Sequence, residues 1–317
     1  MATSVRIGTF NCENLFARFR FRSNVKVGNA TKDGFTINDL AFDFLKLDEK
    51  TLTGQAIRAL DADVITLQEV ENFDVLKRFR NQYLKPLHYT YGVLIEGNDP
   101  RFIDVAVLSR YPLTRVVTHQ ELRSGNSTLF SRDCLEVDVD VKGKPLTLFV
   151  NHLKSMLDKK DPKNGRKNTR ERRLLQAKTV KQLVQDRFGT KAGSKPFVIC
   201  GDLNDYLGAG QGTTDGVSPL VGWGEVENVL DRLPEAERWT HFYETRKTPD
   251  SRPESYKQLD YLLVSRFLAG KSASAPVVVR KGLCTNAALY SGARFAGVGA
   301  SSPAASDHCP VGVDLSI

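Results

Sequence analysis

Short apolar runs rich in β-branched residues recur along the whole chain and predict a protein built largely from buried strands. We expect strands at residues 5–10, 63–70, 103–109, 135–141, 146–152, 197–200, 259–265, 276–280 and 310–315. The run at 135–141 alternates apolar and polar positions, and Lys142-Gly143 separates it from the next apolar run. This pattern predicts a hairpin between a half-exposed strand and a more buried one.

A spacing of three and four residues marks the helices. In segment 168–188 this spacing is kept by Leu174, Ala177, Val180, Val184 and Phe188. The rest of that segment is rich in Arg, Lys and Gln, so it predicts an amphipathic helix. Shorter helices are expected at 52–60 and 74–84, and loops at 208–216 and 291–305.

Strands that interleave with helices and hairpins favour an α/β protein with a mixed sheet and helices outside it. A chain of 317 residues would permit two domains. We nevertheless expect a single domain over residues 1–317, because the polar positions described next lie in both halves of the chain and one site needs them all.

Polar and ionisable residues stand at or just beyond the ends of several apolar runs. They are Asn11, Glu69, His152, Asp202, Asn204, Asp260, Asp307 and His308. Taken singly, an Asp before Leu-Asn is commonly a turn or a cap, but a carboxylate in so apolar a setting is costly without a partner. Together these groups form the donor set of a hard divalent cation, with acid–base help from histidine. Because oxygen donors predominate, Mg²⁺ or Mn²⁺ fits better than Zn²⁺.

Composition narrows the class of protein. Hydrophobic residues make up 41% of the chain, which is enough for a core. No apolar run reaches the roughly 18 residues that a membrane helix needs, and no leader segment is visible. We therefore expect a cytoplasmic protein, although a secreted form with its leader removed would look the same. The five cysteines show no CxxC spacing, which predicts buried thiols.

The net charge of +8 favours a polyanionic partner. Most of this charge comes from residues 158–173, where eight basic and three acidic residues give +5. We expect six of them to contact nucleic-acid phosphates: Lys159, Lys160, Lys163, Arg166, Lys167 and Arg170. A solvated helix face is the alternative. Residues 16–22 interleave Phe with Arg, which suits base stacking and phosphate contacts or, equally, an edge strand or hairpin tip.

Seven segments carry a further signal: FNCENLF (10–16), DVITLQEV (63–70), FSRDCLEV (130–137), VNHLKS (150–155), ICGDLND (199–205), QLDYLLVS (258–265) and SDHCPV (306–311). In this order and strand context they resemble the endonuclease/exonuclease/phosphatase superfamily, which is deoxyribonuclease I-like, and its bacterial nuclease branch. The resemblance implies a four-layer α/β sandwich of two packed mixed sheets flanked by helices. It also implies metal-dependent cleavage of a phosphoester at one end of the sheets.

The same resemblance implies roles for the metal-binding half of the site. Glu69 would be the main metal ligand, supported by Asn11 and Asp307. Asp202 and Asn204 would complete the metal and nucleophile region.

The other half of the site would move protons and hold phosphate. Asp260 would orient His308, which would take a proton from the attacking water. His152 would face the scissile phosphate from the other side. Arg132 would hold a substrate phosphate through its planar fork, and Asp104 has a helper role open to it. The remaining histidines lack such context and are expected to be surface or packing residues: His88, His119 and His241.

The superfamily includes nucleases, apurinic-site endonucleases, sphingomyelinases and inositol phosphatases, so its fold leaves the substrate open. The histidine in VNHLKS argues against the apurinic-site branch, and the sequences typical of inositol phosphatases are not present. We expect a nuclease acting on DNA, with RNA also open, and with little sequence preference. A sphingomyelinase-type or other small-molecule phosphodiesterase is the alternative. A third possibility is an inactive binding protein that kept the fold. The presence of all the expected polar site residues argues against it. Cleavage mode and oligomeric state stay open.

Overall fold

The computed structural model describes residues 3–21, 40–208, 215–243 and 255–317. Two six-stranded mixed sheets form its centre. The first has the order β17 (Val277–Val278), β18 (Val311–Ser316), β1 (Ser4–Leu15), β4 (Val64–Val70), β6 (Asp104–Ser109) and β5 (Tyr91–Leu94). The second has the order β13 (Val226–Asn228), β16 (Asp260–Ser265), β12 (Phe197–Asp202), β11 (Lys144–His152), β10 (Cys134–Val141) and β7 (Leu113–Val117).

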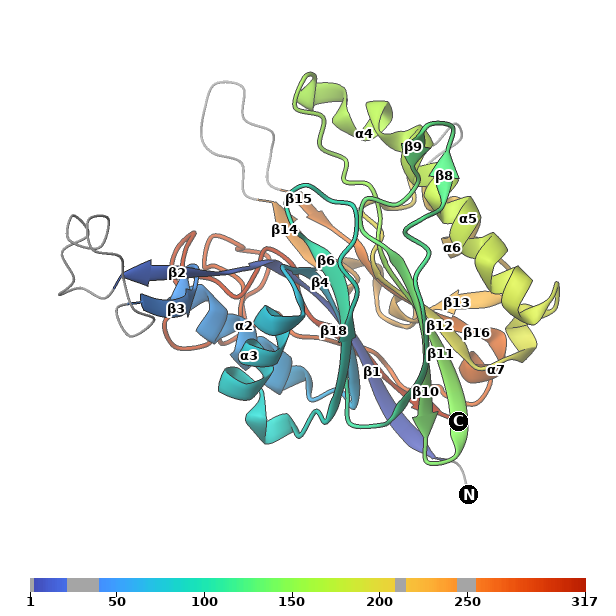
Figure 1. Cartoon of the computed structure of the whole chain (residues 1–317), viewed down its shortest axis with the longest axis horizontal. Coiled ribbons are helices and arrows are strands. Elements are labelled where there is room, and N and C mark those ends of the chain that lie inside the picture. The colour runs from blue at the N-terminus through green and yellow to red at the C-terminus, as the bar shows by residue number, and fades with distance from the viewer. Residues whose placement is uncertain (1–2, 22–39, 209–214, 244–254) are drawn as a thin grey trace.

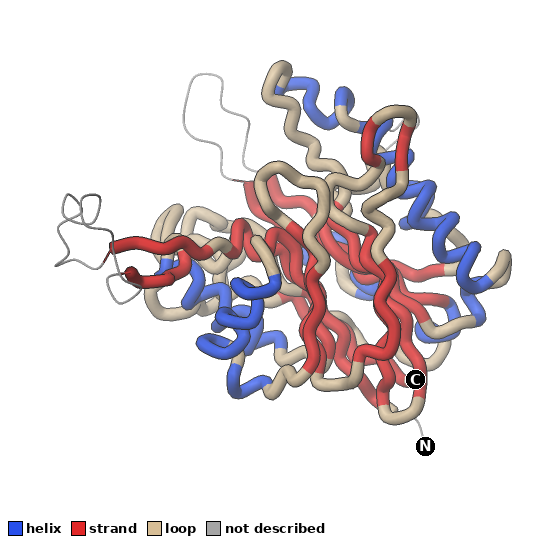
Figure 2. Tube along the Cα trace, in the orientation of Figure 1, coloured by secondary structure: helices blue, strands red, loops and turns tan. Residues whose placement is uncertain are grey.

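Helices cover the outer face of each sheet, and strands occupy the middle of the molecule (Figures 1 and 2). On the first sheet, α2 (Leu47–Leu60) and α3 (Phe73–Tyr83) pack against the even-numbered core residues of β1, such as Phe10. On the second, α5 (Arg170–Phe188) and α6 (Ser218–Val221) pack against Phe149 and Phe197. A third apolar cluster lies between the sheets. The result is the predicted four-layer α/β sandwich.

The remaining elements are short. Three two-stranded ribbons pair β2 (Ala17–Phe21) with β3 (Leu40–Phe44), β8 (Arg123–Ser124) with β9 (Ser127–Thr128), and β14 (His241–Tyr243) with β15 (Ser255–Lys257). Short α-helices are α4 (Gly165–Asn168) and α7 (Arg266–Ala269). Single 3-10 turns occur at Lys85–Leu87, Pro162–Asn164, Ala192–Ser194, Val229–Arg232 and Glu235–Glu237.

The predicted strands and helices are confirmed, and the apolar stripe of segment 168–188 faces the second sheet as expected. Residues 16–22 begin the β2–β3 ribbon, although position 22 lies outside the described residues. Loop 291–305 is confirmed, while most of loop 208–216 lies outside the description. All five cysteines are buried. Within the residues described, no helix is long and apolar enough to cross a membrane.

One prediction is wrong, because β10 is not half-exposed. Its polar residues Glu136 and Asp138 are only 3% and 9% exposed. Arg115 from the neighbouring strand pairs with Glu136, and Arg187 from the end of α5 pairs with Asp138 at 2.7 Å. The alternating pattern of β10 therefore indicated a polar face correctly, but this face is covered by arginine side chains and not by water.

Candidate active site

The site begins where the core between the sheets ends. On β11, β12 and β16, the last inward-facing core residues are Val150, Cys200 and Leu262. His152, Asp202 and Asp260 are each two residues away from these core residues, toward the end of the sheet. They lie on the same strand faces because side chains alternate with a period of two. Strand pairing sets His152 beside Asp202 and Asp202 beside Asp260. The sheet therefore places these three side chains in one row.

His308, just before β18, completes this row from the other sheet. Its Nδ1 lies 2.8 Å from Asp260 Oδ2. The Thr240 hydroxyl donates to the same carboxylate oxygen at 2.7 Å, and this network fixes the ring with Nε2 facing the site. Burial opposes a charge on His308, but Asp260 and Asp202 outweigh it and hold the pKa of the imidazole well above its ordinary value.

Asp202 is the centre of an amide network. Its Oδ2 accepts from Asn11 Nδ2 at 3.1 Å and from Asn204 Nδ2 at 3.0 Å, and its Oδ1 accepts from the Asn204 backbone N–H. Asn204 has φ 54°, a left-handed turn that brings its amide back to the carboxylate. Burial, with Asp260 close by, raises the pKa of Asp202 to about 7. The negative charge of Asp202 is therefore disfavoured in this site.

Glu69 reaches the site because β4 is interrupted there. The strand register shifts between Gln68 and Val70 on both sides, and Glu69 has φ 63°. Such a bulge redirects a side chain that regular alternation would send to the helical face. Its Oε2 accepts from the Asn14 backbone N–H at 3.1 Å, and its Oε1 lies 3.9 Å from His152 Nε2.

His152 and Arg132 form the opposite wall. His152 Nε2 lies 3.5 Å from Asp202 Oδ2, and burial together with the nearby Arg132 and His308 lowers the pKa of His152 well below its ordinary value. Arg132 is itself buried, donating from Nη1 to Asp99 and from Nη2 to the Leu153 carbonyl. Among the described residues, its Nε has no hydrogen-bond partner. Its predicted contact with a substrate phosphate stays a prediction.

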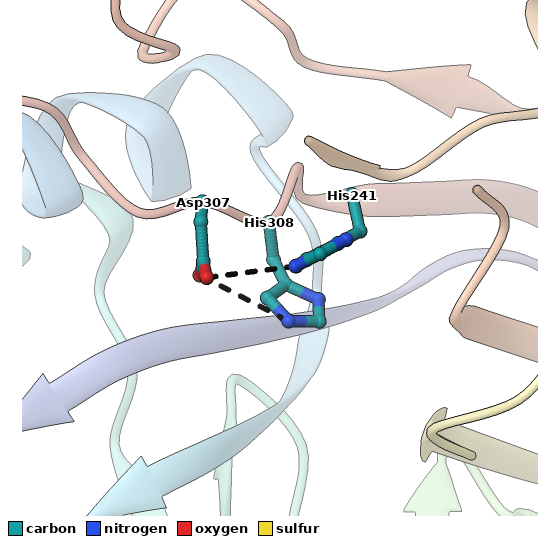
Figure 3. Close-up of side chains that lie close together, drawn as sticks. All are labelled: His241, Asp307 and His308. Carbon is teal, nitrogen blue, oxygen red and sulfur yellow. Dashed lines mark ion pairs between the residues drawn. The ribbon is translucent and has the colours of Figure 1, made fainter. Parts of the chain in front are cut away.

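Two neighbours of Asp307 were not predicted for the site: Glu13 was not singled out, and His241 was expected to be a surface or packing residue. Glu13 Oε2 accepts from the Asp307 backbone N–H at 3.1 Å, and burial, together with Asp307, raises the pKa of Glu13 to about 7. His241 Nε2 lies 3.5 Å from Asp307 Oδ2, and Figure 3 shows the neighbouring imidazoles of His241 and His308 on the same side of this carboxylate. Glu13 follows Asn11 closely and could have been suspected. No local pattern marks His241, because an isolated β-bridge to His308 brings it there.

The predicted basic segment divides into two groups. Lys159, Lys160, Lys163 and Lys167 are exposed. By contrast, Arg166 donates from Nε to the buried Asp205 at 2.7 Å, and Arg170 donates to the Asp215 carbonyl at 3.1 Å. These two guanidinium groups hold the segment to the fold, which local sequence could not indicate.

The site fits a hard divalent cation. Contacts of 3.5 to 3.9 Å link Glu69 through His152 and Asp202 to His308 and Asp307. The donors are mainly carboxylate oxygens, and Asp260 Oδ1 is a buried oxygen without a hydrogen-bond partner in the described part of the chain. Clustered carboxylates are stabilised by a bound cation, which neutralises part of their charge. Glu69, Asn11 and Asp307 are the residues that would hold it.

Two packed sheets that present a carboxylate-oriented imidazole beside clustered acidic groups define a metal-dependent phosphodiesterase, a hydrolase. The chain belongs to the endonuclease/exonuclease/phosphatase family, whose family model matches residues 8–308. No curated protein sequence matches the chain.

Several solved structures share this fold at low sequence identity. Truncated TDP2 from Caenorhabditis elegans has a TM-score of 0.60 and 13% identity, covering 99% of this chain and 98% of that one. TDP2 from D. rerio, complexed with single-strand DNA product, has a TM-score of 0.58 and 15% identity, covering 99% of each chain. Beta toxin from Staphylococcus aureus has a TM-score of 0.57 and 15% identity, covering 97% of this chain and 98% of that one.

Proposed function

We propose that this protein is a Mg²⁺- or Mn²⁺-dependent nuclease that hydrolyses phosphodiester bonds of DNA with little sequence preference; RNA is a second substrate that the panel below tests. The 2.8 Å contact between His308 and Asp260 beside clustered carboxylates carries the hydrolytic part of the proposal. The exposed lysines after β11 support a polyanionic substrate. The D. rerio TDP2 structure with a DNA product has the same fold, which is compatible with this substrate.

His308 is the proposed proton acceptor. Asp260 binds Nδ1, so Nε2 is the ring atom that faces Asp202 and Asp307 at 3.9 Å from each. An imidazole held in this way can take the proton from a water molecule that attacks phosphorus. When bound, a divalent cation would neutralise these carboxylates and the charge that develops on the phosphate. The same neutralisation would draw the pKa of His308 down toward neutrality.

The remaining residues position the substrate. Asp202 and Asn204 would orient the attacking water through the amide network. His152, kept neutral by its surroundings, would donate to a non-bridging oxygen of the scissile phosphate. Arg132 adds a positive charge near His152. Its Nε–H, which has no protein partner among the described residues, would donate to a substrate phosphate.

The lysine group supplies affinity without reading bases. Lys159, Lys160, Lys163 and Lys167 lie in the segment that follows His152 and the end of β11, and we propose that this segment borders the site. Exposed ammonium groups bind phosphates as point charges and carry no base-specific geometry. Arg166 and Arg170, which have protein acceptors, are expected to contribute mainly by fixing this segment.

A substrate panel tests the proposal. Supercoiled plasmid, linear duplex, single-stranded DNA and RNA are each incubated with Mg²⁺, Mn²⁺, Ca²⁺ or EDTA, with sphingomyelin and an aryl phosphodiester in parallel. We expect cleavage of nucleic acid with Mg²⁺ or Mn²⁺, none with EDTA, and little with His308→Ala. Cleavage of sphingomyelin without cleavage of DNA would replace the proposal by its alternative. Equal rates for His308→Ala and the parent protein would remove His308 as the proton acceptor.

A further inference from the structure

His241, Asp307 and His308 form a nitrogen-rich corner of the site. Asp307 lies 3.5 Å from His241 Nε2 through Oδ2 and 3.9 Å from His308 Nε2 through Oδ1. The ring centroids of the two histidines are 4.6 Å apart. Figure 3 shows both imidazoles turned toward the same carboxylate from different chain segments. Their potential ligand atoms all lie within 4.8 Å of one another.

The geometry is close to that of a tetrahedral zinc site. Zinc–nitrogen and zinc–oxygen bonds of about 2.0–2.2 Å place tetrahedral ligands about 3.4 Å apart. The observed separations of 3.5 and 3.9 Å end on the two different oxygens of Asp307, and all potential ligand atoms lie within 4.8 Å of one another, so a bound ion would draw the three groups together. The Asp307 side chain is 44% exposed, so an ion would reach this carboxylate from solvent.

The groups that contact the far nitrogen of His308 also resemble those found behind a metal-binding histidine. His308 Nδ1 faces Asp260, and Thr240 donates to the same Asp260 oxygen. A carboxylate behind a histidine fixes the tautomer and strengthens the opposite nitrogen as a ligand. Two imidazoles and one carboxylate favour zinc or a similar transition metal over Mg²⁺, which prefers oxygen ligands.

We propose that His241, Asp307 and His308 form an inhibitory site for Zn²⁺ or a similar borderline divalent metal. The inhibitory part rests on the proposed function, because zinc at this corner occupies His308 Nε2, the proposed proton acceptor. It also occupies Asp307, a proposed ligand of the activating cation. Zinc therefore blocks the reaction both by removing the base and by competing for one carboxylate.

Binding is tested directly with Co²⁺, which reports tetrahedral coordination by its visible absorption. We expect the parent protein to give an intense tetrahedral spectrum that one equivalent of Zn²⁺ abolishes. His241→Asn should weaken Co²⁺ binding at least about tenfold. The matched control is His119→Asn, because His119 Nε2 also faces a carboxylate, Glu136 at 3.3 Å, but belongs to no cluster of three possible metal ligands among the described residues. This control should bind Co²⁺ like the parent protein.

Inhibition is then measured as the nuclease rate with Zn²⁺ divided by the same variant's rate without it. We expect micromolar-range inhibition that His241→Asn shifts at least about tenfold and that His119→Asn leaves in place. Unchanged Co²⁺ binding in His241→Asn would overturn the site, and activation by Zn²⁺ would overturn its inhibitory role. If no nuclease activity is found, the spectrum still decides the site, so the failure of either proposal is recognised separately.

Discussion

His308 Nδ1 and Asp260 Oδ2 are 2.8 Å apart although 48 residues separate them in the chain, and both side chains are buried. This contact sets which nitrogen of the imidazole faces the phosphate. It also stabilises the imidazolium that forms when the ring takes a proton. The Thr240 hydroxyl, which donates to the same oxygen, keeps the carboxylate in place.

The first prediction concerns this pair. His308→Ala should lower kcat by about 10²- to 10⁴-fold, because the proton acceptor is lost. Asp260→Asn should lower kcat less. It should also move the acid limb of the pH–rate profile to lower pH, since removal of the carboxylate lowers the pKa of His308. Steady-state rates on plasmid DNA with Mn²⁺ across the pH range measure both effects. An unmoved acid limb in Asp260→Asn would contradict the assignment.

The second prediction concerns the salt dependence of DNA binding. Replacing Lys159, Lys160 and Lys163 by Gln should make the slope of log affinity against log salt less steep by about 1 to 3, because each phosphate contact contributes about 0.7–0.9. Fluorescence anisotropy with labelled DNA in Ca²⁺ or EDTA gives the slope. A matched triple replacement at the opposite end of the sheets changes Lys142, Lys191 and Lys195. The lysine group has no binding role if both triple variants give the same slope.

The third prediction concerns Gly201, which precedes Asp202 on β12. Gly201 has φ 123°, and a Cβ there would meet the Asn151 carbonyl oxygen at 1.9 Å. Gly201→Ala should therefore lower the free energy of unfolding by several kcal/mol, roughly 3 or more, and displace the neighbouring carboxylate. Gly143→Ala is the control, because Gly143 in the β10–β11 turn also has positive φ but open space around it, and should cost only about 1–2 kcal/mol. Urea denaturation compares the two variants, and similar losses would refute the close-contact argument.

The fourth prediction concerns Asp104, whose Oδ1 accepts from the Gly97 N–H at 2.8 Å. Burial raises the pKa of Asp104 to about 6, above the value near 3.9 of an unfolded chain. Its contribution to stability is therefore present below about pH 4 and is lost as the pH rises through 6. Asp104→Asn keeps the acceptor and removes the charge. Relative to the parent protein, its free energy of unfolding should increase by roughly 1–3 kcal/mol between pH 4 and pH 7.5. Urea denaturation at both pH values measures this difference, and a constant difference would show that Asp104 does not titrate as described.

Some of the site could be predicted because it continues a local pattern. His152, Asp202 and Asp260 fall on the inward face of apolar strands, so alternation alone places them at the end of the core. Glu69 breaks that alternation, and only the bulge in β4 explains how it reaches the others. The prediction that β10 is half-exposed was wrong for a related reason, since arginines from other elements cover its acidic side chains.

The sequence by itself determined where the strands lie along the chain and most of the faces they bury, because hydrophobic periodicity records burial along one segment. Its motifs also carried the family signature. Only the tertiary structure decided which charged groups meet across long separations. It brought His241 beside Asp307, and it tied Arg166 to Asp205 while leaving the neighbouring lysines exposed. Such long-range contacts depend on how the two sheets pack and on the paths of the loops between strands, so no single segment of the sequence encodes them.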